Sequence, residues 1–232
     1  MNLHMINIEE IFEKYDIKLS KEQTKKFELF LKLFIEKNSQ VNLSAIRDEA
    51  WIIEKHFIDS LILTKHANLK GKVLDLGTGW WFPGIPLKIF HKNDINITLL
   101  DSVWKKITAV NEFCKNLNLE QIHWIHGRAE ELGQDKKYRA SYDYIVSRSV
   151  AYLPNLLEYT IPLLKEWWEF IAYKLDNYEE VEASYKAMKA LKCMVERVEK
   201  YEIEWQERVL LFIKKTWKTP SEYPRNNNLI KW

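Results

Sequence analysis

Hydrophobic residues recur at helical spacing through the first quarter of the chain. The spacing predicts three helices, over residues 6–17, 20–38 and 48–66. Ser20 followed by Gln23 is a capping-box start for the second of them. Because all three precede the first apolar strand pattern, they are expected to form an N-terminal helical cap, residues 1–68, packed on the core rather than part of a sheet.

Beyond residue 68 the pattern changes to short apolar runs that alternate with helical segments. The expected strands are one ending at residue 76 and others over 95–101, 122–126, 142–147 and 170–174, with helices over 83–91, 103–117, 153–165 and 178–191. Two β-rich segments, 193–203 and 208–215, then pair as a hairpin. This order predicts an α/β fold with a doubly wound, seven-stranded, mostly parallel sheet, in one continuous unit over residues 69–232.

The first strand ends in a glycine turn. Its apolar run stops abruptly at Gly77, and Gly77 and Gly79 allow a sharp turn and a close approach to a ligand because neither carries a Cβ. Pro83 and Pro86 follow, and proline is tolerated in the first turn of a helix. A strand, a turn and a helix N-terminus in this order present free backbone N–H groups to a polar ligand.

Two acidic residues accompany the turn. Asp75 precedes Gly77 by two positions, where a carboxylate can orient the loop or meet a cationic ligand such as S-adenosylmethionine (SAM). Asp101 ends the second strand, where nucleotide-binding folds grip ribose hydroxyls. NAD-binding folds share this acid, but they usually require a third glycine, and Phe82 occupies that position. An ordinary strand-to-helix turn is the alternative without a ligand.

Composition narrows the class of protein. At 232 residues and 47% hydrophobic content the chain supports a substantial core. No apolar run approaches the roughly 18 residues that span a bilayer, and the N-terminus lacks a signal-peptide pattern, so we expect a cytoplasmic protein without membrane contact. Cys114 and Cys193 are expected to be reduced packing residues. His123 and His126 lack a third ligand nearby, so no metal site is expected.

Several motifs, taken together in this order, resemble the RsmG (GidB) family of class I SAM-dependent methyltransferases, which methylate N7 of a guanine in bacterial 16S ribosomal RNA. The resemblance covers nearly the whole chain. The matching pieces are Asn38 with 41–44, 56–61, the stretch 77–87 with its F-P-G-I-P-L, Asp101-Ser102, Lys105-Lys106, 127–130, the S-R-S-V-A of 147–151, Lys174, Lys215 and 223–225. F-P-G-I-P-L and S-R-S-V-A are specific to the family, whereas D-x-G-x-G alone is not.

The resemblance implies roles for particular residues. Gly77 and Phe82 border the cofactor's methionine and adenosine, Ala129 and Glu130 its adenine, and Arg148 the mouth of the pocket. The full set of expected cofactor-binding residues is Asp75, Gly77, Gly79, Phe82, Asp101, Ala129, Glu130 and Arg148. Four basic residues are candidate phosphate contacts: Lys105, Lys106, Lys215 and Arg225. For each of them a solvated surface charge is the equal alternative.

The same resemblance sets the expected partners and chemistry. The cofactor is SAM, the substrate is small-subunit ribosomal RNA or an assembling 30S subunit, and the protein is expected to be a monomer. Guanine N7 carries an in-plane lone pair and no proton, so no general base is needed and no catalytic residue is assigned. His56 and Asp59 on the third predicted helix are interpreted as a half-buried histidine and a solvated or capping carboxylate.

The chain departs from the family at tryptophans. It has 10 Trp and 6 Gly, although average glycine usage of about 7% predicts roughly 16. Tryptophan stands where the family has glycine or a small residue at Trp80, Trp81, Trp104, Trp167 and Trp168. Indoles in the turn are expected to block close approach of a ligand and to forbid positive φ.

Two hypotheses explain these tryptophans. Either the chain is a family member with an impaired site, or the recorded tryptophans come from UGA codons that specify glycine. We favour the second, because the replacements cluster at turns. Five UGG codons would exclude it.

Three other functions remain open at this point. A catalytically silent RNA- or ribosome-binding homologue keeps the fold without holding SAM, and SAM titration separates it from the enzyme. A NAD- or nucleotide-binding protein is disfavoured by the absent third glycine. A SAM-dependent methyltransferase with another substrate, a small molecule or a protein, is the remaining enzyme.

Overall fold

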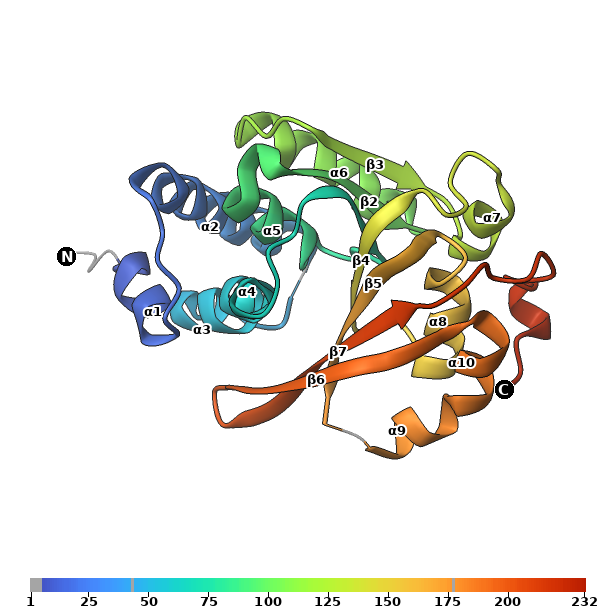
Figure 1. The fold of residues 1–232 in the computed structure, drawn as a ribbon. Coiled ribbons are helices and arrows are strands. Elements are labelled where there is room, and N and C mark those ends of the chain that lie inside the picture. Colours follow the sequence, from blue (N-terminus) through green and yellow to red (C-terminus); the bar gives the residue numbers. More distant parts are fainter. Residues whose placement is uncertain (1–5, 43, 177) are drawn as a thin grey trace.

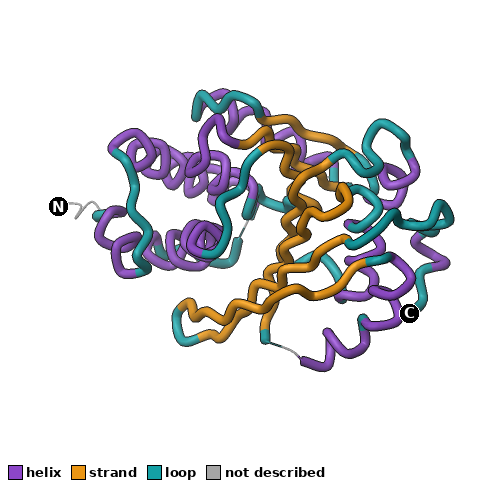
Figure 2. Tube along the Cα trace, in the orientation of Figure 1, coloured by secondary structure: helices purple, strands orange, loops and turns teal. Residues whose placement is uncertain are grey.

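The computed structural model describes residues 6–42, 44–176 and 178–232, so Leu43, which belongs to one of the family motifs, lies outside the described residues. A seven-stranded sheet with strand order β3-β2-β1-β4-β5-β7-β6 forms the centre of the molecule (Figures 1 and 2). Its strands are β1 Gly71–Leu76, β2 Ile95–Asp101, β3 Ile122–His126, β4 Tyr142–Arg148, β5 Leu164–Leu175, β6 Cys193–Ile203 and β7 Gln206–Lys215. The first five pair in parallel, and β7 runs antiparallel between β5 and β6. The predicted fold class is confirmed.

Helices cover both faces of this sheet (Figure 1). One face carries the N-terminal helices and the first two helices of the alternation: α1 Ile8–Lys14, α2 Lys21–Val41, α3 Glu49–Ile52, α4 Asp59–Leu61, α5 Gly84–His91 and α6 Trp104–Asn116. The other carries α7 Ala129–Gln134, α8 Leu153–Thr160 and α10 Tyr185–Leu191, with the short α9 Tyr178–Ala183 before α10. Each face therefore has its own hydrophobic cluster, as doubly wound sheets require.

The N-terminal helices join the sheet through aromatic side chains. Phe30 of α2 stacks on Phe57 with ring centroids 4.9 Å apart, and its ring lies 5.7 Å from that of Phe82, which follows the glycine turn. All three belong to the hydrophobic cluster that also contains Val73 of β1. Packing rather than propensity holds these helices in place. The division of the chain near residue 68 into an N-terminal helical cap and a core unit stays a prediction.

The local structure departs from the sequence pattern before β5 and before β1, and Ser184 divides the helix expected over 178–191 into α9 and α10. The helix expected over 153–165 ends at Thr160, and β5 begins at Leu164 rather than at residue 170. Pro162 explains this, because Ile161 still has helical backbone but proline has no N–H to continue the helical hydrogen bonds. The helix expected over 48–66 is interrupted by a π-helical stretch, Ile53–Ile58, which separates α3 from α4 and is followed by a 3₁₀ turn, Ile62–Lys65.

Tryptophan occupies left-handed backbone at three described positions. The φ angle is 75° at Trp81, 72° at Trp167 and 62° at Trp205. Glu204, with φ of 49°, and Trp205 are the two residues between β6 and β7, and a two-residue hairpin turn with positive φ at both positions typically has glycine second. The expectation that tryptophan would forbid positive φ in the glycine turn is therefore wrong for Trp81. Trp205 adds a position that the sequence pattern alone did not single out.

Replacing an exposed tryptophan at positive φ by glycine is expected to stabilise the fold. Left-handed backbone destabilises a residue with a Cβ by about 1–2 kcal/mol. Glycine removes this strain, but it also increases the conformational entropy of the unfolded chain, which lowers the gain by about 0.4–1 kcal/mol. Trp167→Gly and Trp205→Gly should each raise the free energy of unfolding by roughly 0.5–1 kcal/mol in urea denaturation. Trp51→Gly, at an exposed helical position in α3, is the control and should lower it by about 1 kcal/mol. Equal losses in all three variants would contradict the prediction.

Candidate active site

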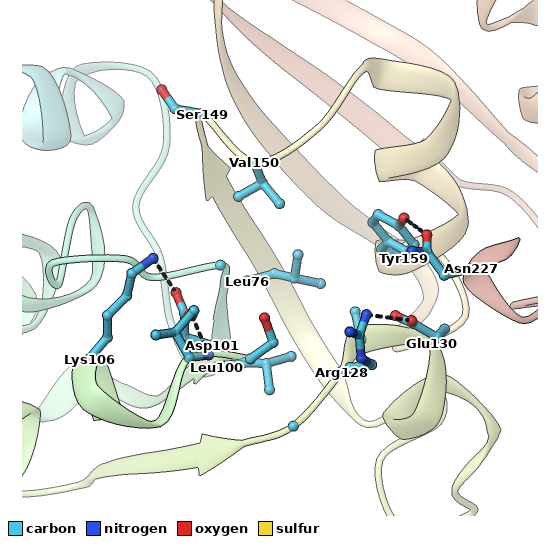
Figure 3. Close-up of a pocket in the computed structure, with 15 residues that line it drawn as sticks. Leu76, Leu100, Asp101, Lys106, Arg128, Glu130, Ser149, Val150, Tyr159 and Asn227 are labelled. Atoms are coloured by element: carbon cyan, nitrogen blue, oxygen red, sulfur yellow. Dashed lines mark hydrogen bonds and ion pairs between the residues drawn. The ribbon is translucent and has the colours of Figure 1, made fainter. Parts of the chain in front are cut away.

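The carboxyl ends of the first four parallel strands meet beside a cavity of about 290 Å³, drawn in Figure 3. It is lined by the end of β1, by Asp101 at the end of β2, by the loop from β3 into α7, and by Tyr159 of α8 with Asn227 from the C-terminal tail. Open α/β sheets bind their ligands at this edge, and ligand pockets begin at about 300 Å³. We call this the first cavity.

The glycine turn forms one wall of the first cavity. Gly77 and Thr78 donate backbone N–H bonds to the Leu100 carbonyl, at 2.8 and 3.0 Å. Gly77 has φ of 70°, and a Cβ there would lie 2.3 Å from a methyl carbon of Val150. Gly79 has φ of 55° but would find open space around a Cβ, its nearest atom being the Gly77 carbonyl oxygen at 3.8 Å. The turn thus needs glycine at Gly77 for room and at both positions for backbone conformation.

Asp101 fastens the turn to the neighbouring strand. Its Oδ2 lies 3.5 Å from the Lys106 ammonium (Figure 3). The same oxygen accepts from the Gly79 N–H at 2.9 Å, while Oδ1 accepts from the Val103 N–H at 2.9 Å. The carboxylate lies in the wall of the first cavity and fixes both the turn and the start of α6. A role toward ribose hydroxyls stays a prediction.

Asp75 lies beneath the turn rather than in the cavity wall. It is completely buried, and its Oδ2 accepts from the Thr78 hydroxyl at 2.7 Å and from the Gly84 N–H at 2.9 Å. Burial raises its pKa to about 7, against the lowering effect of these two hydrogen bonds. Of the two roles considered from sequence, orienting the loop is the one that these contacts support.

The loop after β3 supplies the opposite wall. Ala129 and Glu130 begin α7 and line the first cavity, and Glu130 lies 3.5 Å from the Arg128 guanidinium (Figure 3). The Tyr159 hydroxyl donates to Asn227 at 2.5 Å across the same cavity. Sequence reasoning missed this last pair because it depends on where the C-terminal tail crosses α8.

A second cavity, of about 240 Å³, adjoins the first and shares Gly77, Lys106 and Ser149 with it. Its lining includes Phe82 and Arg148, both predicted site residues, together with His56 and Ser44 from the N-terminal helical region. The two cavities therefore meet at the glycine turn.

His56 is part of this second cavity, not an isolated packing residue. Its ring stacks on Phe82 with centroids 4.8 Å apart, and its Nε2 lies 3.1 Å from the Ser44 hydroxyl. Burial and the nearby Arg148 guanidinium lower the pKa of His56 to about 3, so the ring is neutral at pH 7. The sequence-based interpretation of His56 as a half-buried histidine agrees with its intermediate exposure. It did not include the second cavity, which only the folded chain reveals.

One of the four predicted phosphate contacts is corrected by the structure. Lys215 is buried, and its ammonium donates to the carbonyls of Ile161 and Leu164 at 3.0 and 2.7 Å, so it is a core residue. The Arg225 guanidinium is bonded on two sides to the buried Glu158 carboxylate, at 2.7 and 2.9 Å, while its side chain stays partly exposed. A phosphate contact of Arg225 stays a prediction.

The other two basic residues lie near the cavities. Lys106 lines both cavities and contacts Asp101, which places it at the carboxyl ends of the parallel strands. Lys105 is exposed on the first turn of α6. Whether either contacts RNA stays a prediction. Among the described residues, no group of three or more His, Cys, Asp and Glu side chains is placed to hold a metal ion.

The tryptophans of the turn point to different places. Trp81 is fully buried with its ring 4.0 Å from that of Phe113, and its Nε1 donates to the Lys106 carbonyl at 3.3 Å. Trp80 is half-buried and lines the second cavity. The expectation of two indoles blocking the ligand is therefore wrong for Trp81, which leaves the first cavity open.

These features fit a SAM-sized ligand. The turn contributes Gly77 to the wall of the first cavity, and the walls supply carboxylates from Asp101 and Glu130. Donors, acceptors and apolar side chains such as Val150 and Leu100 alternate around the cavity (Figure 3). Nucleoside ligands need this mixture, with few but well-placed polar groups.

The neutral state of His56 predicts a pH dependence of stability. An unfolded histidine has a pKa of about 6.5, so between pH 6.5 and 3 the unfolded chain binds a proton that the folded chain excludes. The contribution of His56 to the free energy of unfolding is therefore fully present above pH 6.5 and decreases as the pH falls, by about 2 kcal/mol at pH 5. His56→Phe should flatten the fall between pH 7.5 and 5 in urea denaturation. A slope equal to that of the unmodified chain would contradict this.

Comparisons with solved structures show the fold. A SAM-dependent methyltransferase from Aquifex aeolicus aligns with a TM-score of 0.55 at 16% identity, over 77% of this chain and 97% of that chain. A ribosomal protein L11 methylase from Lactobacillus delbrueckii subsp. bulgaricus aligns with a TM-score of 0.53 at 19% identity, over 70% and 79%. The sheet and its flanking helices thus have the same fold as these two proteins.

Comparisons with sequences show the family. The GidB family model, described as rRNA small subunit methyltransferase G, matches residues 23–210. A ribosomal RNA small subunit methyltransferase G from Desulforamulus reducens is 42% identical over 230 residues, 97% of this chain and 95% of that protein. Another, from Thermoanaerobacter sp. (strain X514), is 42% identical over 210 residues, 88% and 87% of the two. The chain belongs to the GidB family, the rRNA small subunit methyltransferases G.

Proposed function

We propose that this chain transfers a methyl group from SAM to N7 of a guanine in 16S ribosomal RNA. The observation that carries the proposal is that two cavities meet at the glycine turn, sharing Gly77, Lys106 and Ser149. A methyl transfer needs two ligands side by side, and family membership supplies the identity of both.

The first cavity is the place for the cofactor. The residues that would hold SAM there are Gly77, Asp101, Ala129 and Glu130. Gly79 lines the second cavity and is tied to Asp101 through its N–H, so it would meet the cofactor from that side. Phe82 and Arg148 lie in the second cavity, next to the turn, where the reacting ends would meet. Bound SAM supplies an electrophilic methyl group on a sulfonium.

The chain's own contribution is positioning. Guanine N7 has a lone pair in the ring plane and no proton to lose, so no side chain has to act as a base. The neutral ring of His56 agrees with this, because the second cavity then lacks an imidazolium that would repel a positively charged purine. The walls have to hold N7 about 3–3.5 Å from the methyl carbon and in line with the methyl–sulfur bond.

Electrostatics favours the same arrangement. Positive charge moves from the sulfonium to the purine during transfer, so fixed negative groups near both ligands stabilise it. Asp101 and Glu130 provide carboxylates in the first cavity. In the second, the Arg148 guanidinium is paired at 2.7 Å with the buried Asp59 carboxylate, which also pairs with Arg208, so its charge is offset in part.

The polynucleotide is expected to cross the open side of the second cavity. Arg47, Lys55 and Lys105 carry charges on segments that border it, and such groups contact phosphates without reading sequence. Naked 16S RNA and an assembling 30S subunit are the two candidate forms of the substrate. We place the reaction in the cytoplasm and expect a monomer. In the part of the chain that the structure describes, no helix has the length and apolar character to cross a bilayer.

The function is tested with labelled SAM and small ribosomal subunits from a strain that lacks this methyltransferase. We expect label in 16S RNA, recovered as 7-methylguanine by mass spectrometry. Trp80→Gly should increase the rate, because it clears the wall of the second cavity, while changing the SAM dissociation constant less than threefold. SAM binding without transfer in either form would favour the silent RNA-binding homologue. Label in protein or in another base would point to a different substrate.

Removing the charge of Asp101 should weaken cofactor binding. The Gly79 and Val103 N–H groups bond to different oxygens of the carboxylate, and in asparagine one of these is an NH2 group that cannot accept, so the turn loosens. Asp101→Asn is expected to raise the SAM dissociation constant at least tenfold in calorimetric titration. The matched control is Asp143→Asn, which removes an acid at the opposite edge of the sheet, where it accepts from the Lys72 N–H and from Lys165. Equal binding by the two variants would contradict a role for Asp101.

A further inference from the structure

A buried charge cluster connects the N-terminal helices to the sheet. Asp59, at the start of α4, is completely buried, and its Oδ2 accepts from Arg148 at 2.7 Å and from Arg208 at 3.0 Å. Its Oδ1 accepts from the Tyr201 hydroxyl at 2.8 Å. One carboxylate therefore joins α4, the end of β4 and both strands of the C-terminal hairpin. The sequence-based interpretation of Asp59 as a solvated or capping carboxylate is therefore wrong.

The cluster ends at the second cavity. The Arg148 guanidinium lies 5.2 Å from the centre of the Phe82 ring, which in turn stacks on His56, and all three residues line that cavity. The Arg148 guanidinium also donates to the Lys55 carbonyl, at a long 3.4 Å. The strong, charge-assisted bond to Asp59 is thus what fixes the orientation of this guanidinium.

The backbone before Asp59 is specialised for the same purpose. The π-helical stretch Ile53–Ile58 contains both Lys55 and His56 and ends at the residue before Asp59. Short π-helical stretches inside helices occur mostly at functional sites. Here His56, inside the stretch, lines the second cavity, and Asp59, the residue after it, bonds to Arg148 of the same cavity.

We propose that Asp59 is a positioning residue of the methyl-transfer site, which acts by holding the Arg148 guanidinium against the second cavity. The proposal rests on the proposed function, because it assumes that the two cavities hold the reacting ligands. Arg208 and Tyr201 complete the arrangement by holding Asp59 itself. The carboxylate would then couple the packing of the N-terminal helices and the hairpin to the geometry of the site.

The orientation of Arg148 is measured without any ligand. In protein labelled with ¹⁵N-arginine, a fixed guanidinium gives resolved N–H signals, assigned to Arg148 by their loss in Arg148→Lys. We expect Asp59→Asn to broaden or average these signals, and Asp143→Asn, the control at the other end of β4, to leave them unchanged. Tyr201→Phe removes one bond to Asp59 and keeps the charge, so it replaces Asp59→Asn if that variant fails to fold. Unchanged Arg148 signals in a folded variant would overturn the proposal.

Calorimetric titration of SAM connects this orientation to the site. Arg148 lies next to the turn, where the reacting end of SAM would reach the second cavity, so Asp59→Asn should raise the dissociation constant at least tenfold and Asp143→Asn less than twofold. If Asp59 acts through Arg148, the double variant Asp59→Asn/Arg148→Ala binds SAM no more weakly than Arg148→Ala. Additive losses would overturn the proposal, and so would unchanged affinity in Asp59→Asn. Failure of the proposed function looks different, since the unmodified chain would then bind SAM and leave 16S RNA unmethylated while these differences persist.

Discussion

The turn at the end of β1 is the constraint on which the rest of the site depends. Its backbone leaves the sheet abruptly, so its N–H groups need acceptors that a neighbouring strand cannot all provide. Two carboxylates provide them from opposite sides: Asp75 from below, to Gly84, and Asp101 from the next strand, to Gly79. The turn is therefore held at both of its ends, and the two cavities form on either side of a rigid wall.

The sequence was sufficient for the fold and for this turn because both depend on local order. Alternating apolar runs and amphipathic segments leave little choice of topology once parallel strands must be joined by right-handed crossovers. The turn is similarly local, with Gly77 and its neighbours within ten residues and Asp101 at the end of the adjacent strand. These features were predictable because the residues that interact are fixed by the order of the elements.

What the sequence did not reveal depends on distant partners. Lys215 and Arg225 have charges typical of phosphate contacts, yet one donates to core carbonyls and the other to Glu158, 67 residues away. Arg148 and Asp59 likewise meet across 89 residues. A charged residue has the same appearance in a sequence whether its partner is a phosphate or a buried carboxylate, so burial decided between them, and burial is a property of the folded chain.

The unusual tryptophans were found partly from the sequence and partly from the folded chain. Residue type identified the unusual positions in the turn, but only the backbone shows that Trp167 and Trp205 occupy conformations that glycine adopts at no steric cost. Positive φ at the second position of a two-residue hairpin turn is required by the twist of the strands, whatever side chain is present. The strain therefore arises from the fold and not from the site. A chain that has to make these turns favours glycine there independently of any ligand, which is why Trp205, far from the family motifs, follows the same pattern as Trp81.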